Sequence, residues 1–353
     1  MSRSPIVATL DRLPRFPLAV LPTPLEHAAN LSRALDIQLW IKRDDLTGLA
    51  LGGNKVRKIE YLVGDALAEG ATSLLTTAAA QSNFCRVAAA AGARAGLRVG
   101  LLLRGTGTEP IQGNLLLDHL LGAEIRFTDQ MDPYAEGTRR RLDAWVEEER
   151  ARGERPYLIY LHGGSHAGAL AAAAYVQAAV ELDAQCRAGG IHPDHLYVAV
   201  GSGSTLAGLL VGARGPAEGL ASTCITGVCV GALSDVVDTK VREFARAAAA
   251  LLGAPVPNEP LRLDDGERGD AYGVPTAAAL AAIRTAAMSE ALIFNPVYTG
   301  KAFAALLRDV AQGTVAPGST VVFINTGGDP LIFANAAHLA GPLGQAHRAG
   351  TAQ

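Results

Sequence analysis

Short, nearly continuous apolar runs alternate with longer alanine- and leucine-rich stretches along most of the chain. Continuous apolar runs are typical of parallel strands buried on both faces, and the stretches between them are long enough for helices. The predicted strands are 37–43, 71–77, 98–104, 123–128, 156–161, 195–200, 226–230 and 319–326. The clearest predicted helices are 56–70, 82–96 and 111–122. This alternation predicts an α/β fold built on mostly parallel sheet with helices on both faces.

Clusters of small polar residues follow several of the predicted strands. The sequences AAAQSN, LHGGSH, VGSGST and NTGG each stand between an apolar run and a stretch of helical character. Ligands of open α/β sheets bind at the carboxyl ends of the strands, so these clusters predict the site. One long polar segment, 253–270, is rich in proline and glycine. We expect it to be a surface excursion or a cover over the site.

Composition narrows the class of partner. The chain has 353 residues, 49% of them hydrophobic, which is enough for two lobes or one large domain. A formal net charge of −3 and a pI near 6.2 argue against nucleic acid and anionic membranes as partners. Prolines break the N-terminal apolar runs, so no signal peptide is predicted, and the alanine-rich stretch from Ala167 is expected to be a packed helix. We therefore expect a cytoplasmic protein.

Cysteine and histidine spacing predicts no metal site. Cys224 and Cys229 lack the CxxC spacing of metal ligands, and the cysteines are expected to be buried free thiols. His162 and His166 flank a GGS turn, but two histidines without further ligands are more typical of a structural or pocket-lining role.

Two glycine-rich segments come close to nucleotide-binding motifs without completing them. In LALGGNKVRK (49–58), Asn54 follows the glycines where a phosphate loop has lysine, and Val56 stands where serine or threonine would hold magnesium. In GSGSTLAG (201–208), Leu206 occupies the place of the third glycine of a dinucleotide fingerprint. A nucleotide-binding function is therefore disfavoured.

The GSGST segment is nevertheless suited to a single anion. It follows the apolar run LYVAV and precedes the helical LAGLLVGA. Its glycines allow a tight turn, so that the amides and hydroxyls at the helix N-terminus can converge on one phosphate monoester. The residues concerned are Ser202, Gly203, Ser204 and Thr205. A plain strand–turn–helix connection with a capped helix is the other interpretation.

A single-phosphate site together with Lys55 on a glycine turn is what pyridoxal phosphate requires, because the aldehyde bonds to an amine while the turn holds the phosphate. At this point the chain resembles the 1-aminocyclopropane-1-carboxylate deaminase and D-cysteine desulfhydrase family. The resemblance rests on LPTPLE (21–26), WIKRDDLTGLALGGNKVRKIEYL (40–62), AAAQSNFCR (78–86), GSGST (201–205), AYGVP (271–275) and NPVYTGKA (295–302).

This resemblance implies the two-lobed pyridoxal-phosphate fold type II, which is related to tryptophan synthase β. Residues 1–60 and 165–353 are expected to form a large cofactor-binding lobe, and 61–164 a small lobe that closes over the substrate. The resemblance also implies a homodimer.

Roles for the residues near the glycine turn follow from the resemblance. Lys55 is implied to bond the cofactor aldehyde, and Asn54 to lie against its 3-hydroxyl group. Arg57 and Lys58 are interpreted as a charged face that is either solvated or close to the phosphate. The run 42–45, KRDD, is expected to form structural ion pairs at a strand end.

Gln81, Ser82 and Asn83 stand where a strand ends and a helix begins. Amides there can bind a substrate carboxylate, whereas the alternative role for Ser82 is simply to cap the helix. In the deaminase branch the matching serine is a proposed nucleophile or proton relay. The preceding alanines, 78–80, replace glycines that relatives often have, so they are expected to narrow the substrate pocket.

Four residues bear on the reaction. Tyr272 and Tyr298 match active-site tyrosines of the family, where their hydroxyls can orient or protonate the substrate. Thr299 replaces the deaminase glutamate that keeps the pyridine nitrogen protonated, and Thr326 replaces a deaminase leucine. With a hydroxyl at this position the ring withdraws electrons less strongly. Expelling a good leaving group such as thiolate needs less electron withdrawal than opening a cyclopropane. These threonines favour β-elimination from a small amino acid such as D-cysteine.

The alternatives stay open at this stage. Cyclopropane deamination is one, and L-cysteate sulfo-lyase action is another that would need a cationic pocket residue, for which Arg86 or His166 are candidates. Gly164, Ser165 and His166 are expected at the rim of the substrate pocket. A cofactor-binding or sensor protein without catalysis is the alternative from another class.

Overall fold

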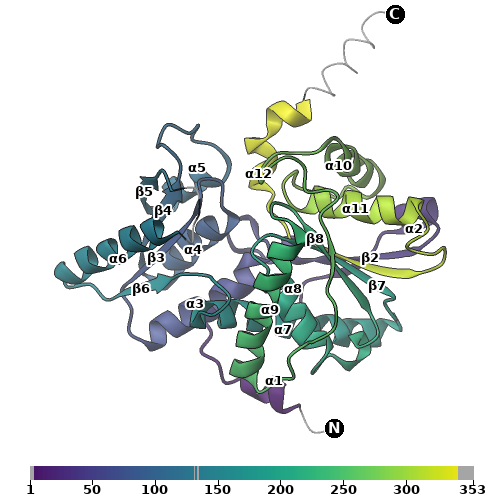
Figure 1. Ribbon diagram of the computed structural model, residues 1–353, viewed down its shortest axis with the longest axis horizontal. Helices are drawn as coiled ribbons and strands as arrows, with labels where there is room; N and C mark the ends of the chain where they lie inside the picture. The colour runs from purple at the N-terminus through teal and green to yellow at the C-terminus, as the bar shows by residue number, and fades with distance from the viewer. Residues whose placement is uncertain (1–3, 131, 133–134, 341–353) are drawn as a thin grey trace, which may run out of the picture.

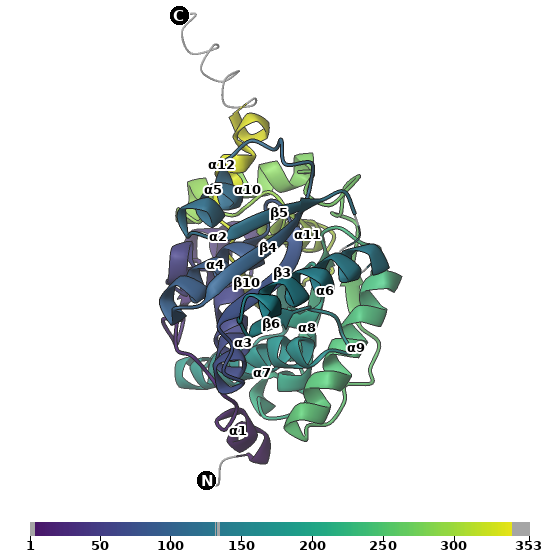
Figure 2. The same cartoon turned by 90° about the vertical axis from the view of Figure 1, so that its left-hand side faces the viewer.

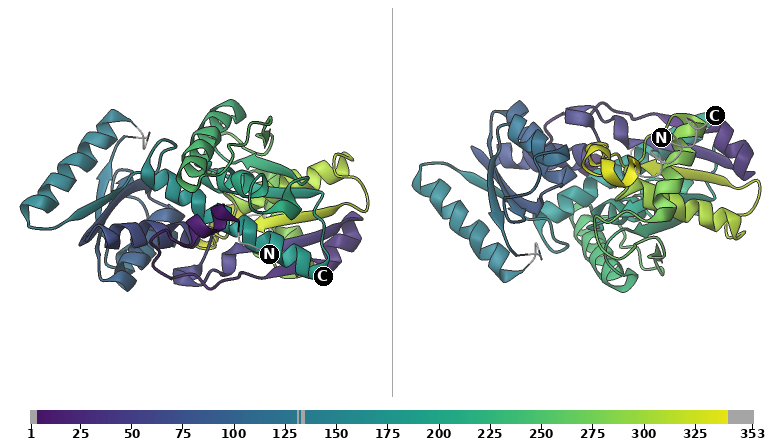
Figure 3. Two further views of the ribbon diagram at one scale, coloured as in Figure 1. Left: turned by 90° about the horizontal axis from the view of Figure 1, so that it is seen from below. Right: turned by 90° about the horizontal axis from the view of Figure 1, so that it is seen from above.

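Two mostly parallel sheets organise the computed structural model, which describes residues 4–130, 132 and 135–340 (Figure 1). The smaller sheet has the order β5-β4-β3-β6 and all its pairings are parallel. Its strands are β3 (Ser73–Ala79), β4 (Arg98–Arg104), β5 (Glu124–Thr128) and β6 (Pro156–Ile159). Figure 3 shows the two sheets beside each other along the length of the molecule.

The larger sheet has the order β1-β2-β10-β7-β8-β9, and only the β1–β2 pair is antiparallel. Its strands are β1 (Leu25–His27), β2 (Gln38–Arg43), β7 (His195–Val200), β8 (Cys224–Cys229), β9 (Arg262–Asp264) and β10 (Thr320–Asn325). All eight predicted strands are therefore present, and the α/β prediction is confirmed. The continuous apolar runs arise because alternate side chains enter cores on opposite faces of the sheet.

Helices cover both faces of each sheet. On the large sheet, α7, α8 and α9 share one core with Leu196, Val198 and Val200, while α2, α10 and α11 share the other with Tyr197 and Ala199. On the small sheet, α3, α4 and α5 pack on one face and α6 on the other, as Figure 2 shows for α4 and α6. The helices are α1 (Pro5–Leu10), α2 (Ala29–Leu35), α3 (Lys55–Ala68), α4 (Asn83–Ala95), α5 (Gly113–Leu120), α6 (Glu136–Ala151), α7 (His166–Gly189), α8 (Ser204–Ala213), α9 (Ser234–Leu252), α10 (Ala277–Glu290), α11 (Thr299–Ala311) and α12 (Pro330–Ala334). Short 3₁₀ segments lie at Asp44–Leu46, Leu49–Leu51 and Glu218–Leu220.

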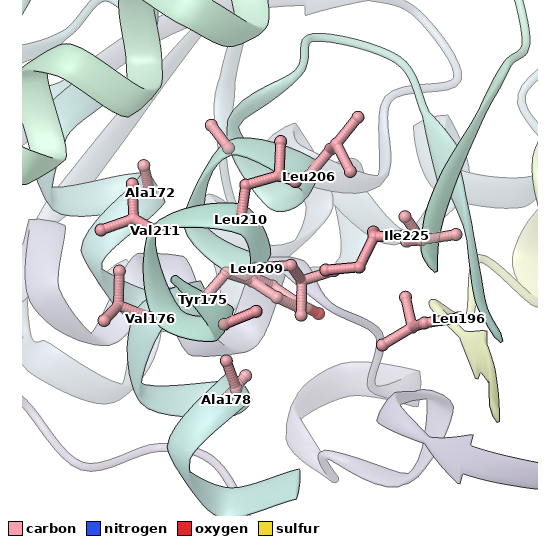
Figure 4. Packing of buried hydrophobic residues seen from close by; sticks show 14 of the residues in the cluster. Ala172, Tyr175, Val176, Ala178, Leu196, Leu206, Leu209, Leu210, Val211 and Ile225 are labelled. Carbon is pink, nitrogen blue, oxygen red and sulfur yellow. The ribbon is translucent and has the colours of Figure 1, made fainter. Parts of the chain in front are cut away.

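Helix α8 is anchored in the core of the large lobe (Figure 4). Leu206, Leu209 and Leu210 are buried against α7 and against Leu196 and Ile225 of strands β7 and β8. Burial of each leucine contributes about 2 kcal/mol as an upper estimate. This packing fixes the N-terminus of α8 at the carboxyl end of β7.

Gly208 lets α8 approach α7 closely. A Cβ at this position would lie 2.2 Å from the backbone oxygen of Ala172, so no larger residue fits without moving one helix. The alanine-rich stretch of α7 is the packed helix that its composition predicts, with Ala171–Ala174 buried. In the described part of the chain, no helix is both long and apolar enough to cross a bilayer.

Two strands were not predicted. β1 and β9 are three residues long and mostly polar. They are the two edge strands of the large sheet, so each has a neighbouring strand on one side only and is less buried than the central strands. β9 lies within the polar segment 253–270, which is therefore partly an edge strand rather than only a surface excursion or cover. The predicted lobe boundary at residue 60 falls within α3, and 1–3 and 341–353 of the predicted large lobe lie outside the described residues. The boundaries stay a prediction.

Candidate active site

A cavity of about 370 Å³ lies between the carboxyl ends of the two sheets. Thr76, Thr77 and Ala78 of β3 line it from the small sheet, and Ala199, Val200 and Gly201 of β7 and the turn after it line it from the large sheet. Ten of the residues predicted for the site line this cavity: Asn54, Lys55, Ser82, Asn83, Ser202, Gly203, Thr205, Tyr272, Tyr298 and Thr326. Segments far apart in the sequence are thus brought to one place.

The GSGST turn leads into α8, as predicted. Gly203 has a φ of 105°, a left-handed conformation that favours glycine, and α8 begins at Ser204. Ser202, Gly203 and Thr205 line the cavity, while the hydroxyl of Ser204 accepts a hydrogen bond from Lys58. The turn therefore presents a helix N-terminus and hydroxyl groups to the cavity, which suits an anion.

Lys58 lies beneath this turn and is buried rather than solvated. Its Nζ donates to Ser204 Oγ at 2.8 Å and to Thr205 Oγ1 at 2.7 Å, and it lies 5.4 Å from the ring centre of Tyr175. Burial lowers the pKa of Lys58 well below its ordinary value, and the charge of Lys55 lowers it further. Of the two interpretations of Lys58, the structure excludes the solvated face.

The hydroxyl of Thr205 is oriented by its neighbours. Its Oγ1 accepts hydrogen bonds from Lys58 and, at 3.1 Å, from Asn54 Nδ2. Because both lone pairs of this oxygen are then occupied, its own hydrogen is available to donate. Thr205 thus acts as a donor on the cavity wall, which again suits an anionic ligand.

Lys55 is the first residue of α3 and its amine faces the cavity. Its Nζ donates to Asn54 Oδ1 at 3.1 Å. Burial lowers the pKa of Lys55 to about 8, with a smaller contribution from the charge of Arg86. A substantial fraction of the amine is therefore neutral near physiological pH, as a nucleophile or a base must be.

Ser82 caps helix α4, which begins at Asn83. Its Oγ accepts from the amides of Phe84 and Cys85 at 3.1 and 3.2 Å, so the capping role is present. The hydroxyl still carries a hydrogen, and both Ser82 and Asn83 line the cavity, so capping leaves the substrate role open. Gln81 is not among the described residues that line the cavity. Its side chain is instead hydrogen-bonded to the backbone of Gln112 and Asn114.

Tyr272 and Tyr298 meet at the cavity wall. Their hydroxyls are hydrogen-bonded to each other and their rings are 6.0 Å apart in an edge-on arrangement. Burial raises the pKa of Tyr298 well above its ordinary value and raises that of Tyr272 as well. Both hydroxyls therefore keep their hydrogens near neutral pH; one donates to the other, and the second hydrogen remains for a ligand.

Thr299 and Thr326 differ in position. Thr326 lines the cavity, and its backbone oxygen accepts from the amide of Asn54 at 3.0 Å. Thr299 is buried behind the wall at the start of α11, where its Oγ1 accepts from the amide and from Nδ2 of Asn295 at 2.9 and 3.0 Å. Like Thr205, it is left with only its own hydrogen to offer.

Three predicted rim residues do not reach the cavity. Ser165 caps α7 by accepting from the amide of Gly168, and His166 Nε2 lies 3.1 Å from a carboxylate oxygen of Asp65. Ser165 and His166 line a separate surface groove, and Gly164 lines neither. Arg86, suggested above as a cationic pocket residue, is fully buried and bonds backbone carbonyls instead of lining the cavity.

Sequence reasoning missed several cavity residues. Arg104 and Tyr160 follow the general pattern of the site, because each lies at or just past the carboxyl end of a predicted strand. Lys240 of α9 carries no such signal, since only the tertiary packing of α9 against the 201–205 turn brings it there. Within the described residues, no group of three or more His, Cys, Asp or Glu side chains is arranged to hold a metal ion.

The chain is similar to known proteins over most of its length. The model of the family described as pyridoxal-phosphate dependent enzymes matches residues 17–327. A D-cysteine desulfhydrase of Klebsiella pneumoniae is 38% identical over 336 residues, covering 94% of this chain and 98% of the relative. A Pyrococcus horikoshii protein, provisionally named a 1-aminocyclopropane-1-carboxylate deaminase, is 38% identical over 323 residues, covering 92% and 94%.

Solved structures extend the comparison. A crystal structure of a homologue of 1-aminocyclopropane-1-carboxylate (ACC) deaminase has a TM-score of 0.85 at 36% identity, covering 96% of this chain and 99% of the other. The processed form of threonine deaminase isoform 2 from Solanum lycopersicum has a TM-score of 0.66 at 16% identity, covering 95% of this chain and 86% of the other. The second likeness is one of fold alone.

Proposed function

Because the chain belongs to the family of pyridoxal-phosphate-dependent enzymes, in the group of ACC deaminases and D-cysteine desulfhydrases, we propose that it is a lyase acting by β-elimination on a small amino acid. The favoured substrate is D-cysteine. With one water, D-cysteine gives pyruvate, ammonia and hydrogen sulfide, so that atoms balance and no oxidant is needed.

The residues of the cavity fit the cofactor. The half-buried amine of Lys55 faces the cavity and is implied by the resemblance to bond the aldehyde. The turn from Ser202 to Thr205, together with the Lys58 ammonium beneath it, offers an anion site that suits the phosphate. When bound, pyridoxal phosphate supplies the electron-withdrawing ring that acidifies the α-proton of the substrate.

Thr299 is the single observation that carries the choice of reaction. The resemblance implies that this residue stands where a deaminase has the glutamate that pairs with the pyridine nitrogen. The oxygen of Thr299, buried behind the cavity wall, is already occupied by two hydrogen bonds from Asn295, so a hydroxyl at this position cannot accept from a protonated nitrogen. A neutral ring withdraws electrons less strongly, which favours a reaction with a good leaving group such as thiolate.

The chain's own side chains then have distinct tasks. Lys55, with a pKa of about 8, takes the proton from the substrate α-carbon. Ser82 and Asn83, at the positive end of α4, hold the substrate carboxylate. The neutral hydroxyls of Tyr272 and Tyr298 orient the substrate or protonate the leaving group.

L-cysteate sulfo-lyase action is the second candidate. Its substrate carries a sulfonate, and the cationic side chains of Arg104 and Lys240 line the cavity. These residues, rather than Arg86 or His166, line the cavity that would receive a second negative charge, together with the carboxylate of Asp132. Homodimer assembly and a cytoplasmic location remain predictions.

The test is a substrate panel on purified, cofactor-loaded protein. D-cysteine, L-cysteine, L-cysteate, D-serine and 1-aminocyclopropane-1-carboxylate are compared for keto acid, sulfide and sulfite. Pyruvate and sulfide formed fastest from D-cysteine are expected. Faster 2-oxobutanoate formation from the cyclopropane, or sulfite from L-cysteate, would replace the proposed substrate. A bound chromophore without any keto acid would indicate the non-catalytic alternative.

A further inference from the structure

Arg86 is a buried cation whose hydrogen bonds join two parts of the candidate site. It lies on α4 and is fully buried. Its Nη2 donates to the backbone oxygen of Gly52 at 2.9 Å, its Nη1 donates to that of Ala50, and its Nε donates to Asn114 Oδ1 at 2.9 Å. Among the described residues no carboxylate forms an ion pair with it. Burying a guanidinium that bonds only neutral oxygens raises the free energy of the folded chain, so we expect these contacts to have a role.

The two backbone oxygens belong to an unusual turn that leads directly into Lys55. Ala50, Leu51, Gly52 and Gly53 have φ values of 42°, 69°, 61° and 103°. A left-handed conformation is unfavourable for Ala50 and Leu51, which are not glycines, so contacts from the surrounding structure must stabilise this turn. Arg86 bonds the first and third of these residues, and thereby fixes the path of the chain into α3.

The third bond of Arg86 reaches the segment that holds Ser82. Asn114 Nδ2 donates to the backbone oxygen of Gln81 at 3.0 Å and to Asn83 Oδ1 at 2.8 Å. The amide of Asn114 donates to Gln81 Oε1 at 3.0 Å. The 81–83 segment, expected to bind the substrate carboxylate, is thus fixed through Asn114 to the same guanidinium that fixes the turn before Lys55.

We propose that Arg86 is a positioning residue, which holds the 50–53 turn in its left-handed path and ties it through Asn114 to the 81–83 segment. The Lys55 amine and the carboxylate site thereby keep one relative geometry, although they stand at the starts of two different helices, α3 and α4. The inference rests on the proposed role of Lys55. The positive charge of Arg86 has a second consequence, since it adds to burial in keeping the pKa of Lys55 low.

Arg86→Lys and Arg86→Gln test this role. Lysine keeps a positive charge but cannot reach three acceptors, and glutamine loses the charge. In both variants, amide hydrogen exchange of peptides covering 48–56 should rise about tenfold, with peptides covering β7 unchanged. The kcat should fall about 100-fold or more, and the KM should rise because the 81–83 segment loosens.

The pH dependence separates positioning from general damage. Among the described residues, the charge of Arg86 on α4 adds to burial in lowering the pKa of Lys55, and the charge of Lys55 in turn lowers the pKa of Lys58 on the same helix. Asp118 and Asp329 are the carboxylates that act on Arg86. Loss of the charge in Arg86→Gln should move the pH at which Lys55 bonds the cofactor upward, and Arg86→Lys should restore most of that shift. Arg140→Gln, which removes an exposed side chain of the same lobe, is the matched control and should change neither readout.

The outcomes decide between the two proposals. Unchanged exchange at 48–56 and an unchanged pH profile in both Arg86 variants would overturn the positioning role. If neither variant folds, Asn114→Ala is the second test, because it keeps the bonds of Arg86 to the 50–53 turn and removes the connection to the 81–83 segment. It should raise the KM while hydrogen exchange at 48–56 stays unchanged. An unchanged KM would overturn the proposed connection. Failure of the proposed function is seen separately, as a Lys55→Ala variant that still bonds the cofactor.

Discussion

Neighbouring residues of helix α3, Arg57 and Lys58, carry buried charges in opposite circumstances. Arg57 Nη2 lies 2.8 Å from carboxylate oxygens of both Asp44 and Glu181. Burial alone would lower its pKa, but the two carboxylates outweigh burial and raise it well above the ordinary value. Among the described residues Lys58 forms no ion pair with a carboxylate and donates hydrogen bonds to hydroxyls, and burial lowers its pKa.

The difference distinguishes scaffold from site. A buried cation with carboxylate partners completes its own charge balance and contributes to the fold. A buried cation bonded only to neutral oxygens raises the energy of the folded chain, and an anion in the adjacent cavity relieves that cost. By this criterion the ion pairs of Lys42, Asp44, Arg57 and Glu181 are structural, as the KRDD run predicted in part. Lys58 is assigned to the proposed binding site because its partner Thr205 lines the cavity, whereas the neutral partners of Arg86 lie away from the cavity.

The largest expected effect follows from removal of the Lys55 amine. Lys55→Ala should lower activity by about 10⁴-fold or more, because both the covalent attachment and the base are lost. The visible absorbance of protein-bound cofactor should disappear as well. Steady-state assays and absorbance spectra check both, with Arg140→Gln as the control that keeps full activity. An active Lys55→Ala variant would refute the assignment.

Removal of Arg57 should damage stability. Arg57→Leu leaves the Asp44 carboxylate, which is 1% exposed, without its main partner, and should cost about 3–5 kcal/mol in the free energy of unfolding. Urea unfolding of the cofactor-free protein measures it. The exposed pair of Arg140 and Glu136 provides the comparison, since Arg140→Gln should change stability by less than about 1 kcal/mol.

Lys58→Met should show the reverse pattern. Cofactor affinity should fall about 100-fold, because the amine that orients the Ser204 and Thr205 hydroxyls at the phosphate turn is lost. The cofactor-free protein should be as stable as the parent or more so, because an unbalanced buried charge is replaced by an apolar side chain. Titration of cofactor-free protein and urea unfolding give the two numbers. A loss of stability as large as that of Arg57→Leu would erase the distinction between the two residues.

The smallest effect concerns pH. The folded pKa of Lys55 is lowered from 10.5 to about 8, so the reactive neutral amine is depleted as the pH falls below 8. Covalent attachment of added cofactor to cofactor-free protein should therefore speed up about tenfold from pH 6 to pH 7, and level off above about pH 8. Stopped-flow absorbance measures this rate. A rate still rising tenfold per pH unit between about 9 and 10 would indicate an unperturbed lysine.

Most of the correct predictions, of the strands and of the residues at the cavity, came from the apolar pattern and the glycine-rich turns. The eight long strands follow from continuous apolar runs, and the placement of Lys55 and of Ser202–Thr205 at one cavity follows from the rule that parallel strands present their carboxyl ends together. The edge strands β1 and β9 escaped because three polar residues give no periodic signal.

Long charged side chains were the main source of error. Lys58 and Arg86 are polar in sequence yet buried in the fold, because their burial depends on neighbours distant along the chain, such as Ser204 and Asn114. His166 was expected at the pocket rim, but the direction of α7 turns it toward Asp65 in a separate groove. Local sequence does not specify such tertiary contacts.

The central claim is that one particular amine, that of Lys55, carries the cofactor. Borohydride reduction of cofactor-loaded protein makes the attachment permanent, and peptide mass spectrometry then locates it. We expect the cofactor label on the peptide that contains Lys55, with fragmentation placing it on that residue and not on Lys58. A label on Lys58 or on any other lysine, or no label at all, would contradict the account.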